Sequence, residues 1–297
     1  MVLILSLLAC LTLVAVLLQR NVEHRAGLPI SQGKGYTIAR HVQYGITVHN
    51  ETNRLLEKVE LWVHAPVKQT ATQRCEHLQT SHPHELIADE QGNQAVYLVF
   101  RNLPPYAAKI VNVEADLMLS ASPNPIPVQN LDVFLKAEKF IESDDAAICR
   151  LAQSLKAATP LETVGKIFHW VAGNLRYAGY LPKDRGALYA LKNRQGDCSE
   201  FAYLFTACCR ANGIPARVLG GYVCSGNRIL NPADYHDWAE FYVNGVWQIA
   251  DPQRKVFMRD ASQYVAMQML GDSPGNPLGE SHRFRFSGDG IKVSMGP

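Results

Sequence analysis

The first half of the chain alternates hydrophobic and polar positions with the period of two that β-strands produce. In residues 59–64 an aliphatic side chain falls on every second position, and residues 95–100 and 110–119 have a similar pattern. The polar run 89–93, which contains a glycine, supplies a turn. The pattern therefore predicts a small antiparallel β domain, a β-sandwich, over residues 36–121.

The second half changes to the spacing of amphipathic helices. The proline-rich run 122–127 cannot continue a strand or a helix, so it marks a domain boundary. Ser143, followed by two aspartates, predicts one helix start, and residues 159–162 form the capping box of a second helix. A third helix is predicted to begin near Cys198 and to end by Gly213.

Strands follow these helices. Residues 216–223, 237–243 and 246–250 have strand-like composition. Further along, basic side chains alternate with apolar ones over residues 283–293, a pattern typical of an edge hairpin with one solvated face. Because helices precede strands, the pattern indicates an α+β fold class, and we expect this second domain to span residues 128–297.

The amino-terminal residues form an apolar run from Val2 to Leu18. At about 1.5 Å per residue, a helix of this length reaches roughly 25 Å, the short limit of a membrane span. We expect an uncleaved transmembrane helix over residues 1–19 and a linker over residues 20–35. A cleaved signal peptide and a lipid-modified Cys10 are the alternatives, although no small-x-small cleavage site is evident.

The chain of 297 residues is nearly neutral, since 29 Lys and Arg residues against 27 Asp and Glu residues give a formal charge of +2. A balanced chain has no general attraction to phosphates, which argues against nucleic acid as a partner. The hydrophobic fraction of 47% is ordinary for a globular protein. Seven cysteines make a poor disulfide framework at this length, so we expect at least one free thiol.

Cys198 is a candidate nucleophile because the sequence places it at the first position of the third helix. Asp197 is a good N-cap. The unpaired N–H groups and the positive dipole of a helix start stabilise a thiolate, so we expect a lowered pKa for this thiol. Gly196 removes a side chain that would crowd a substrate. The alternative is that Cys198 is simply a small buried residue.

A β-hairpin brings a histidine and an aspartate together. Asn244-Gly245 between two apolar runs is a strong signal for a two-residue type I′ turn. Such a turn pairs residue 243 with residue 246, and continuing the pairing makes Asp251 the diagonal neighbour of His236. Diagonal Cα atoms lie about 7–8 Å apart, close enough for a carboxylate to hydrogen-bond an imidazole. Taken alone, each residue is more often structural.

Four motifs in order resemble the transglutaminase-like superfamily. They are Gly196-Asp197-Cys198, residues 211–217, residues 236–240 and Asp251-Pro252. The resemblance covers roughly residues 160–256 and implies a papain-like domain with Cys198 as nucleophile, His236 as base and Asp251 as orienting carboxylate. The first half resembles, more loosely, the β-sandwich that precedes this domain in many bacterial members. The family includes cross-linkers, cysteine peptidases, peptide N-glycanases and members without known chemistry, so the substrate stays open.

Four residues have predicted supporting roles. Asp197 is the expected N-cap, and Trp238 is expected to cover the His–Asp pair. Glu240 is a candidate structural hydrogen-bond partner, and Gln195 is a candidate oxyanion donor. The spacing of Gln195 from the nucleophile differs from that of papain-type enzymes, so the backbone N–H of Cys198 is the preferred oxyanion donor. Cys208 and Cys209 are expected in the core. The cysteine and histidines of residues 75–85 match no structural zinc spacing, so we expect neither metal nor cofactor.

The expected protein is therefore a papain/transglutaminase-like C-terminal domain preceded by an antiparallel β-sandwich domain and one N-terminal transmembrane helix. Its expected activity is acyl transfer from an amide bond of a protein or peptide through a thioester, with hydrolysis as the outcome. A protein-crosslinking transglutaminase is one alternative. The other is a scaffold subunit of a membrane complex, which binds partners through its β domain and has an idle triad.

The side of the membrane is set by two conflicting signals. Arg20 and Arg25 follow the apolar run and no basic side chain precedes it, which by the positive-inside rule favours the cytoplasm. The resemblance to exported bacterial proteins favours the periplasm. We expect a single-pass anchored protein with its catalytic domain in the periplasm.

Overall fold

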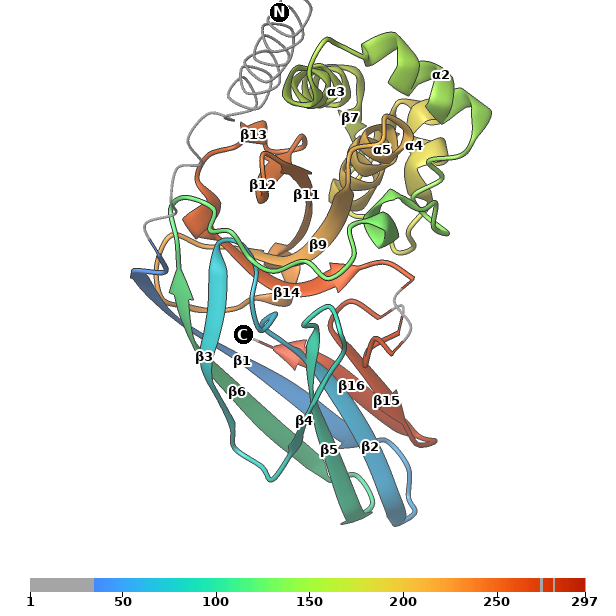
Figure 1. The fold of residues 1–297 in the computed structure, drawn as a ribbon. Coiled ribbons are helices and arrows are strands. Elements are labelled where there is room, and N and C mark those ends of the chain that lie inside the picture. Colours follow the sequence, from blue (N-terminus) through green and yellow to red (C-terminus); the bar gives the residue numbers. More distant parts are fainter. Residues whose placement is uncertain (1–34, 273–274, 280, 297) are drawn as a thin grey trace, which may run out of the picture. The chain divides into compact units, whose positions relative to one another are not determined.

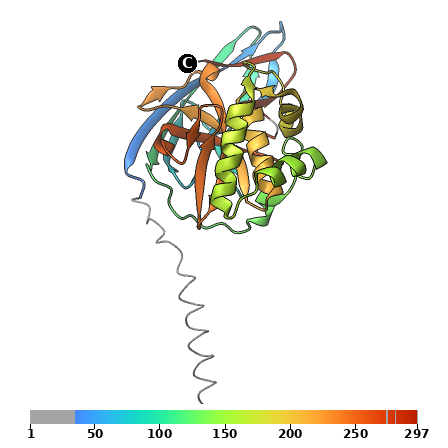
Figure 2. The same cartoon turned by 90° about the horizontal axis from the view of Figure 1, so that it is seen from above.

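The computed structural model describes residues 35–272, 275–279 and 281–296 of the chain, all of which fall in one compact unit (Figures 1 and 2). The expected anchor, and the expected linker up to residue 34, lie outside the described residues. Within the part of the chain that is described, no helix has both the length and the apolar character needed to cross a membrane.

The described residues of the first half form the predicted β-sandwich. One of its sheets contains β1 (Ile38–Asn50), β6 (Ala108–Leu119) and β3 (Gln73–Thr80), and the other contains β2 (Leu56–Ala65), β5 (Gln94–Leu103) and β4 (Glu85–Ala88). Alternate side chains point inward. On β1, for example, Val42, Tyr44, Ile46 and Val48 are buried. They pack with inward residues of β2, β5 and β6 into one core between the sheets.

Three strands from later in the chain complete these sheets. They are β10 (Arg228–Ile229), which pairs with β1 in parallel, β15 (Phe284–Ser287), which pairs with β2, and β16 (Ile291–Gly296), which pairs with β1. The expected hairpin over residues 283–293 is therefore wrong, because its two strands join opposite sheets. The expected second domain, 128–297, is also too long at its end. Each of these strands pairs with the edge of a sheet that earlier strands form. The alternation of apolar and polar residues does not indicate which edge that is.

The rest of the chain is an α+β fold around a single antiparallel sheet in the order β13-β12-β11-β9-β14. The strands are β9 (Ala216–Val223), β11 (Tyr235–Val243), β12 (Val246–Asp251), β13 (Val256–Phe257) and β14 (Tyr264–Leu270). The helices are α2 (Ala146–Leu155), α3 (Pro160–Asn174), α4 (Gly186–Asn193) and α5 (Cys198–Ala211). Two short strands, β7 (Arg176–Tyr177) and β8 (Gln195–Gly196), pair in parallel just before α5.

Helix starts follow their capping residues. The capping box of α3 is present, with Thr159 as N-cap and Pro160 at the first position, as predicted. Helix α2 begins later than predicted from Ser143. Its N-cap is Asp145, whose carboxylate accepts hydrogen bonds from the backbone N–H groups of Ala147 and Ile148. A carboxylate caps better than a hydroxyl here because its charge also faces the positive end of the helix dipole.

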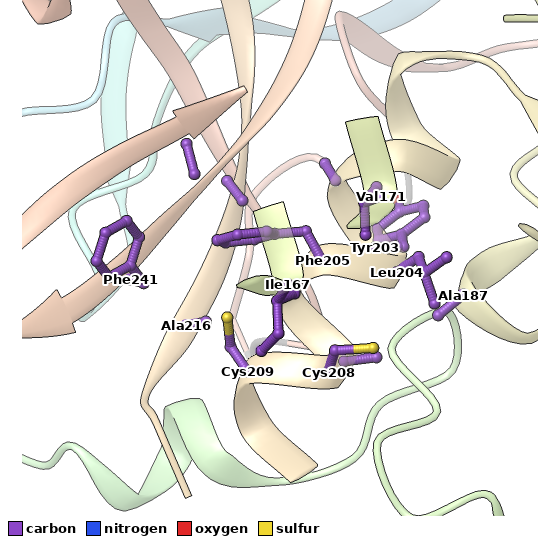
Figure 3. Close-up of a cluster of buried hydrophobic side chains, with 14 of the residues drawn as sticks. Ile167, Val171, Ala187, Tyr203, Leu204, Phe205, Cys208, Cys209, Ala216 and Phe241 are labelled. Carbon is purple, nitrogen blue, oxygen red and sulfur yellow. The ribbon is translucent and has the colours of Figure 1, made fainter. Parts of the chain in front are cut away.

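Helix α5 is the centre of the α+β core (Figure 3). Phe205 and Leu204 are fully buried, and the helix packs against Ala216 and Phe241 of the sheet. The adjacent cysteines Cys208 and Cys209 are core residues, as predicted. Burying each large apolar side chain contributes about 1.5–3 kcal/mol, so the position of α5, including its first turn, is strongly fixed.

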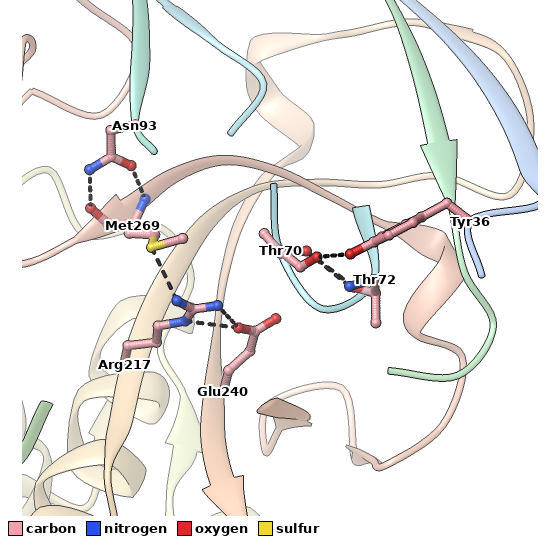
Figure 4. A network of polar contacts seen from close by, with 7 residues as sticks. All are labelled: Tyr36, Thr70, Thr72, Asn93, Arg217, Glu240 and Met269. Carbon is pink, nitrogen blue, oxygen red and sulfur yellow. Dashed lines mark hydrogen bonds and ion pairs between the residues drawn. The ribbon is translucent and has the colours of Figure 1, made fainter. Parts of the chain in front are cut away.

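Side-chain amides join the two halves along strand β14, and Figure 4 shows one of them, Asn93, in contact with Met269. The side chain of Gln73 both donates to the carbonyl of Ala266 and accepts from its N–H, at 2.9 and 2.8 Å. Asn93 makes the same pair of contacts with Met269. These amides imitate a neighbouring strand and satisfy the free edge of β14. The sheet that carries the candidate site is therefore docked to the sandwich by specific hydrogen bonds.

Candidate active site

A rigid turn presents Cys198 as the first residue of α5. The carboxylate of Asp197 accepts the N–H groups of Ser199 and Leu181, each at 2.9 Å, while Glu200 accepts the N–H of Asp197 at 3.0 Å. The predicted N-cap is confirmed. The role expected for Gly196 is different: a Cβ there would lie 2.3 Å from the Cβ of Glu200, so the glycine makes room for this cap rather than for a substrate.

The hairpin has the predicted register. Val243 pairs with Val246, and the pairing continues without a bulge to Ala239 and Ala250. Asn244 and Gly245 have φ angles of 52° and 84°, as a type I′ turn requires. Further back along the hairpin, the predicted His–Asp pair is present.

His236 and Asp251 form a close hydrogen bond, with 2.6 Å between Nε2 of the imidazole and Oδ2 of the carboxylate. Asp251 is fully buried. Its oxygens also accept the hydroxyl of Tyr264 at 2.9 Å and the N–H of Arg254 at 3.0 Å. A carboxylate held from three sides cannot rotate, so it fixes the imidazole. With Nε2 bound to Asp251, Nδ1 is the ring nitrogen left to exchange a proton.

The first turn of α5 is tied to β11 directly after His236. The hydroxyl of Ser199 donates to Oδ2 of Asp237 at 2.6 Å. Ser199 follows the cysteine and Asp237 follows the histidine. This bond therefore ties the first turn of α5 to the strand that carries His236.

The electrostatic surroundings of Cys198 differ from the sequence-based expectation. Burial, followed by the negative charges of Asp237 and Asp197, raises the pKa of the thiol well above its ordinary value, although the N–H of Asp237 acts in the opposite direction. The expected lowering by the helix start is therefore wrong. The first cause is burial, which disfavours the charged thiolate, and the second is that the residues which cap and clamp the helix are carboxylates, whose charges oppose a thiolate.

The remaining predicted residues have structural contacts. Trp238 is buried and packs edge-on against Tyr264 at 5.0 Å between ring centroids, so it supports the hydroxyl that binds Asp251. Glu240 accepts two hydrogen bonds from Arg217, at 2.9 and 2.6 Å, as Figure 4 shows. Gln195 accepts a hydrogen bond from Arg176. This contact uses the side-chain oxygen of Gln195. The role of Gln195 as an oxyanion donor stays a prediction.

Cys198 lines a cleft of about 650 Å³ whose polar residues the sequence analysis mostly missed. On its wall His282 contacts Asp184 at 3.2 Å, and Asp184 also accepts the hydroxyl of Tyr203 at 2.8 Å. Despite burial, the bond to Asp184 and the charge of Asp237 raise the pKa of His282 to about 9. Burial raises the pKa of Asp237 to about 6. No local motif connects these residues, so only Asp237, next to the predicted histidine, carried a signal.

Metal-binding residue types do not gather in the described part of the chain: no group of three His, Cys, Asp or Glu side chains there could hold an ion. Near the cysteine and histidines of residues 75–85, the thiol of Cys75 donates to the carbonyl of His77, and His84 contacts the hydroxyl of Thr80 at 3.1 Å. These are local contacts of a strand and its turn.

Comparison with known proteins gives a family match over the segment that contains this site. The sequence profile of the transglutaminase-like superfamily matches residues 150–252, which contain Cys198, His236 and Asp251. This segment is a transglutaminase-like domain. A search among curated proteins gave no match.

Two solved structures are similar to this chain to different degrees. A candidate cysteine protease from Cytophaga hutchinsonii is 20% identical, with a TM-score of 0.59, and the match covers 87% of this chain and 92% of that chain. The periplasmic domain of TgpA from Pseudomonas aeruginosa is 17% identical, with a TM-score of 0.40, over 75% of this chain and 90% of that chain. At this identity, the first likeness establishes a common fold that extends beyond the transglutaminase-like domain into the sandwich.

Proposed function

We propose that this protein is a cysteine-dependent acyl-transfer enzyme that acts on amide bonds of a protein or peptide. The observation that carries the proposal is the 2.6 Å contact between His236 and Asp251, on a hairpin that is hydrogen-bonded to the first turn of α5. An oriented imidazole on the strand that contacts the first turn of α5, together with a cysteine at the helix N-terminus that lines a cleft, is an arrangement suited to nucleophilic catalysis.

The proposed reaction begins from the thiol form of Cys198, because the pKa of this thiol is raised. Nδ1 of His236 takes the S–H proton as the sulfur attacks the amide carbonyl, and the backbone N–H of Cys198 donates to the oxyanion that forms. The C–N bond then breaks, and the leaving amine takes the proton from His236. A thioester of Cys198 remains.

Water resolves this thioester in the reaction that we favour. His236 takes a proton from the water molecule, the hydroxyl attacks the thioester carbonyl, the C–S bond breaks and Cys198 regains its proton. The observation that favours hydrolysis is the cleft itself. Its volume of about 650 Å³ holds on the order of twenty water molecules. A transamidating enzyme, in contrast, has to keep water from its thioester.

Membrane attachment and location are part of the proposal. Residues 1–19 would anchor the chain, and the catalytic domain would act in the periplasm on a protein or peptide substrate. The sandwich would provide the surface for a partner in a membrane complex. An alkaline wash of membranes followed by protease treatment of spheroplasts tests this placement, since resistance of the domain to protease before lysis contradicts it.

A small acyl donor tests the chemistry without a known substrate. With p-nitrophenyl acetate, we expect a burst of nitrophenolate equal to the enzyme concentration and an acetyl group on Cys198 by mass spectrometry. Cys198→Ala should lose both, whereas Cys149→Ala, which removes an exposed cysteine on α2, should lose neither. Acceleration by added N-acetyl-lysine, with acetylated amine as product, would favour transamidation over hydrolysis. The absence of a Cys198-dependent burst contradicts the proposal.

A further inference from the structure

One wall of the Cys198 cleft comes from the segment that returns to the sandwich. Residues 281–284 line the cleft and continue directly into β15. The segment is held in place from inside the sandwich, because the carbonyl of His282 lies 3.2 Å from Nδ1 of the fully buried His64. Its side chains therefore have fixed positions in the cleft that Cys198 also lines.

The acidic residues of the cleft already have partners. Both oxygens of Asp197 accept backbone N–H groups. Asp184 accepts from Tyr203 and contacts His282, and Asp237 accepts from Ser199. The charge of His282 is accordingly balanced by Asp184 at 3.2 Å. Arg283 is the other cation on this wall, and its contacts differ from those of His282.

Arg283 is anchored but keeps donors available. One of its terminal N–H groups donates to the carbonyl of Pro232 at 2.8 Å, and its guanidinium lies over the ring of Tyr235, 5.9 Å from the centroid. Pro232 and Tyr235 line the same cleft. Among the described residues, no carboxylate forms an ion pair with Arg283. A guanidinium has five N–H donors in a planar fork that matches a carboxylate.

We propose that Arg283 forms a carboxylate-binding subsite beside Cys198, so that the enzyme acts on peptides that carry a free carboxylate near the scissile amide. An arginine that is held by a backbone carbonyl and an aromatic ring is pre-organised, and it binds a carboxylate with little further loss of side-chain freedom. The carboxylate is either the α-carboxylate of a peptide end or an acidic side chain. This subsite rests on the proposed role of Cys198 as nucleophile.

Alkylation of Cys198 in the full-length protein tests the subsite without a known substrate. Three reagents are compared: N-bromoacetyl glutamine, with a free α-carboxylate; the N-bromoacetyl derivative of glutamate α-amide, with a free side-chain carboxylate; and N-bromoacetyl glutamine amide, which is neutral. In each case the sulfur forms a bond to the methylene carbon, bromide leaves and the thiol proton is released. The first two reagents are isomers, so they differ only in where the charge lies.

We expect one charged isomer to alkylate Cys198 about 10-fold faster than the neutral reagent, with saturation at high concentration and loss of the advantage at high salt. The faster isomer identifies the source of the carboxylate. Arg283→Gln should bring the ratio of charged to neutral rates close to one while the neutral rate is kept, and Arg283→Lys should retain part of the advantage. Arg285→Gln is the matched control, because Arg285 lies over Trp62 on the sandwich, at 4.0 Å.

The outcomes separate this inference from the proposed function. Equal rates for all three reagents, or a charged advantage that survives Arg283→Gln, overturn the subsite and leave the nucleophile intact. If none of the reagents modifies Cys198 in the folded protein, the nucleophile itself is wrong and the subsite falls with it. A neutral rate that drops in Arg283→Gln but not in Arg283→Lys shows that the arginine supports the cleft rather than a ligand, which also overturns the subsite.

Discussion

The protein has one His–Asp pair on the hairpin that packs against α5 and another on the wall of the Cys198 cleft, and the two pairs are built in different ways. His236 and Asp251 lie on adjacent strands of one hairpin, 15 residues apart, with 2.6 Å between nitrogen and oxygen. His282 and Asp184 are 98 residues apart, with 3.2 Å between them. The first pair depends on one turn. The second depends on the docking of the sandwich against the α+β domain.

The difference teaches what each pair is suited for. Asp251 has further donors from Tyr264 and Arg254, so the imidazole of His236 is oriented by a rigid network within one sheet. Despite burial, the contact of His282 with Asp184 and the charge of Asp237 raise the pKa of His282 to about 9, which favours the protonated imidazole at neutral pH. A histidine that stays protonated is a poor general base at neutral pH. It is instead an electrostatic link between two domains.

The largest expected effect is the difference between replacing His236 and replacing His282, measured as the rate of acylation by p-nitrophenyl acetate. We expect His236→Ala to slow acylation of Cys198 by on the order of 10²–10⁴ at neutral pH, because the general base is lost. His282→Gln should slow it by less than about 10-fold. Stopped-flow measurement of nitrophenolate release gives both rates. Similar losses in the two variants would mean that the roles of the two pairs have been assigned wrongly.

The pair formed by His282 should stabilise the fold in a pH-dependent way. For a base whose pKa rises from about 6.5 in the unfolded chain to about 9 in the folded one, the added stability is complete below pH 6.5 and lost as the pH rises through 9. His282→Gln should therefore lower the free energy of unfolding by about 2 kcal/mol at pH 6, and by much less at pH 9.5. Urea denaturation at the two pH values measures this. A loss that is equal at both would show that packing, not charge, is what the histidine contributes.

The smallest expected effect is a change in the pH dependence of alkylation. Asp237 is the largest electrostatic cause, after burial, of the raised pKa of Cys198. Asp237→Asn removes this charge, so the pKa of the thiol should fall and the midpoint of iodoacetamide alkylation should move to lower pH. Ser199→Ala is the matched control, because it removes the hydrogen bond that Ser199 donates to Asp237 but leaves the carboxylate in place. A midpoint that moves down in both variants would assign the effect to the bond instead of the charge.

The sequence could predict those parts of the site that local rules determine. Asn244-Gly245 requires a type I′ turn, and the turn alone aligns His236 with Asp251. Asp197 before an apolar helix predicts the cap after which Cys198 begins the helix. The pKa of Cys198 could not be predicted in this way, because it depends on where Asp237 points once helix and strand are packed.

Long-range pairing explains the errors in the fold. The period of two in residues 284–287 and 291–296 predicts strands, and strands are present. Their partners, β2 and β1, lie at the other end of the described chain, and hydrophobic alternation carries no information about them. For the same reason the pair of Asp184 and His282 had no signal in the sequence.

The return of β15 and β16 to the sandwich also has a consequence for the order in which the protein is made. A ribosome releases β1 and β2 long before residues 284–296 exist, so the emerging chain carries both sheets with unfilled edges. Residues 281–284, which complete the cleft, arrive in the same late segment. Until that segment is synthesised, Cys198 lacks one wall of its cleft. The cleft can therefore be complete only after most of the chain has been synthesised.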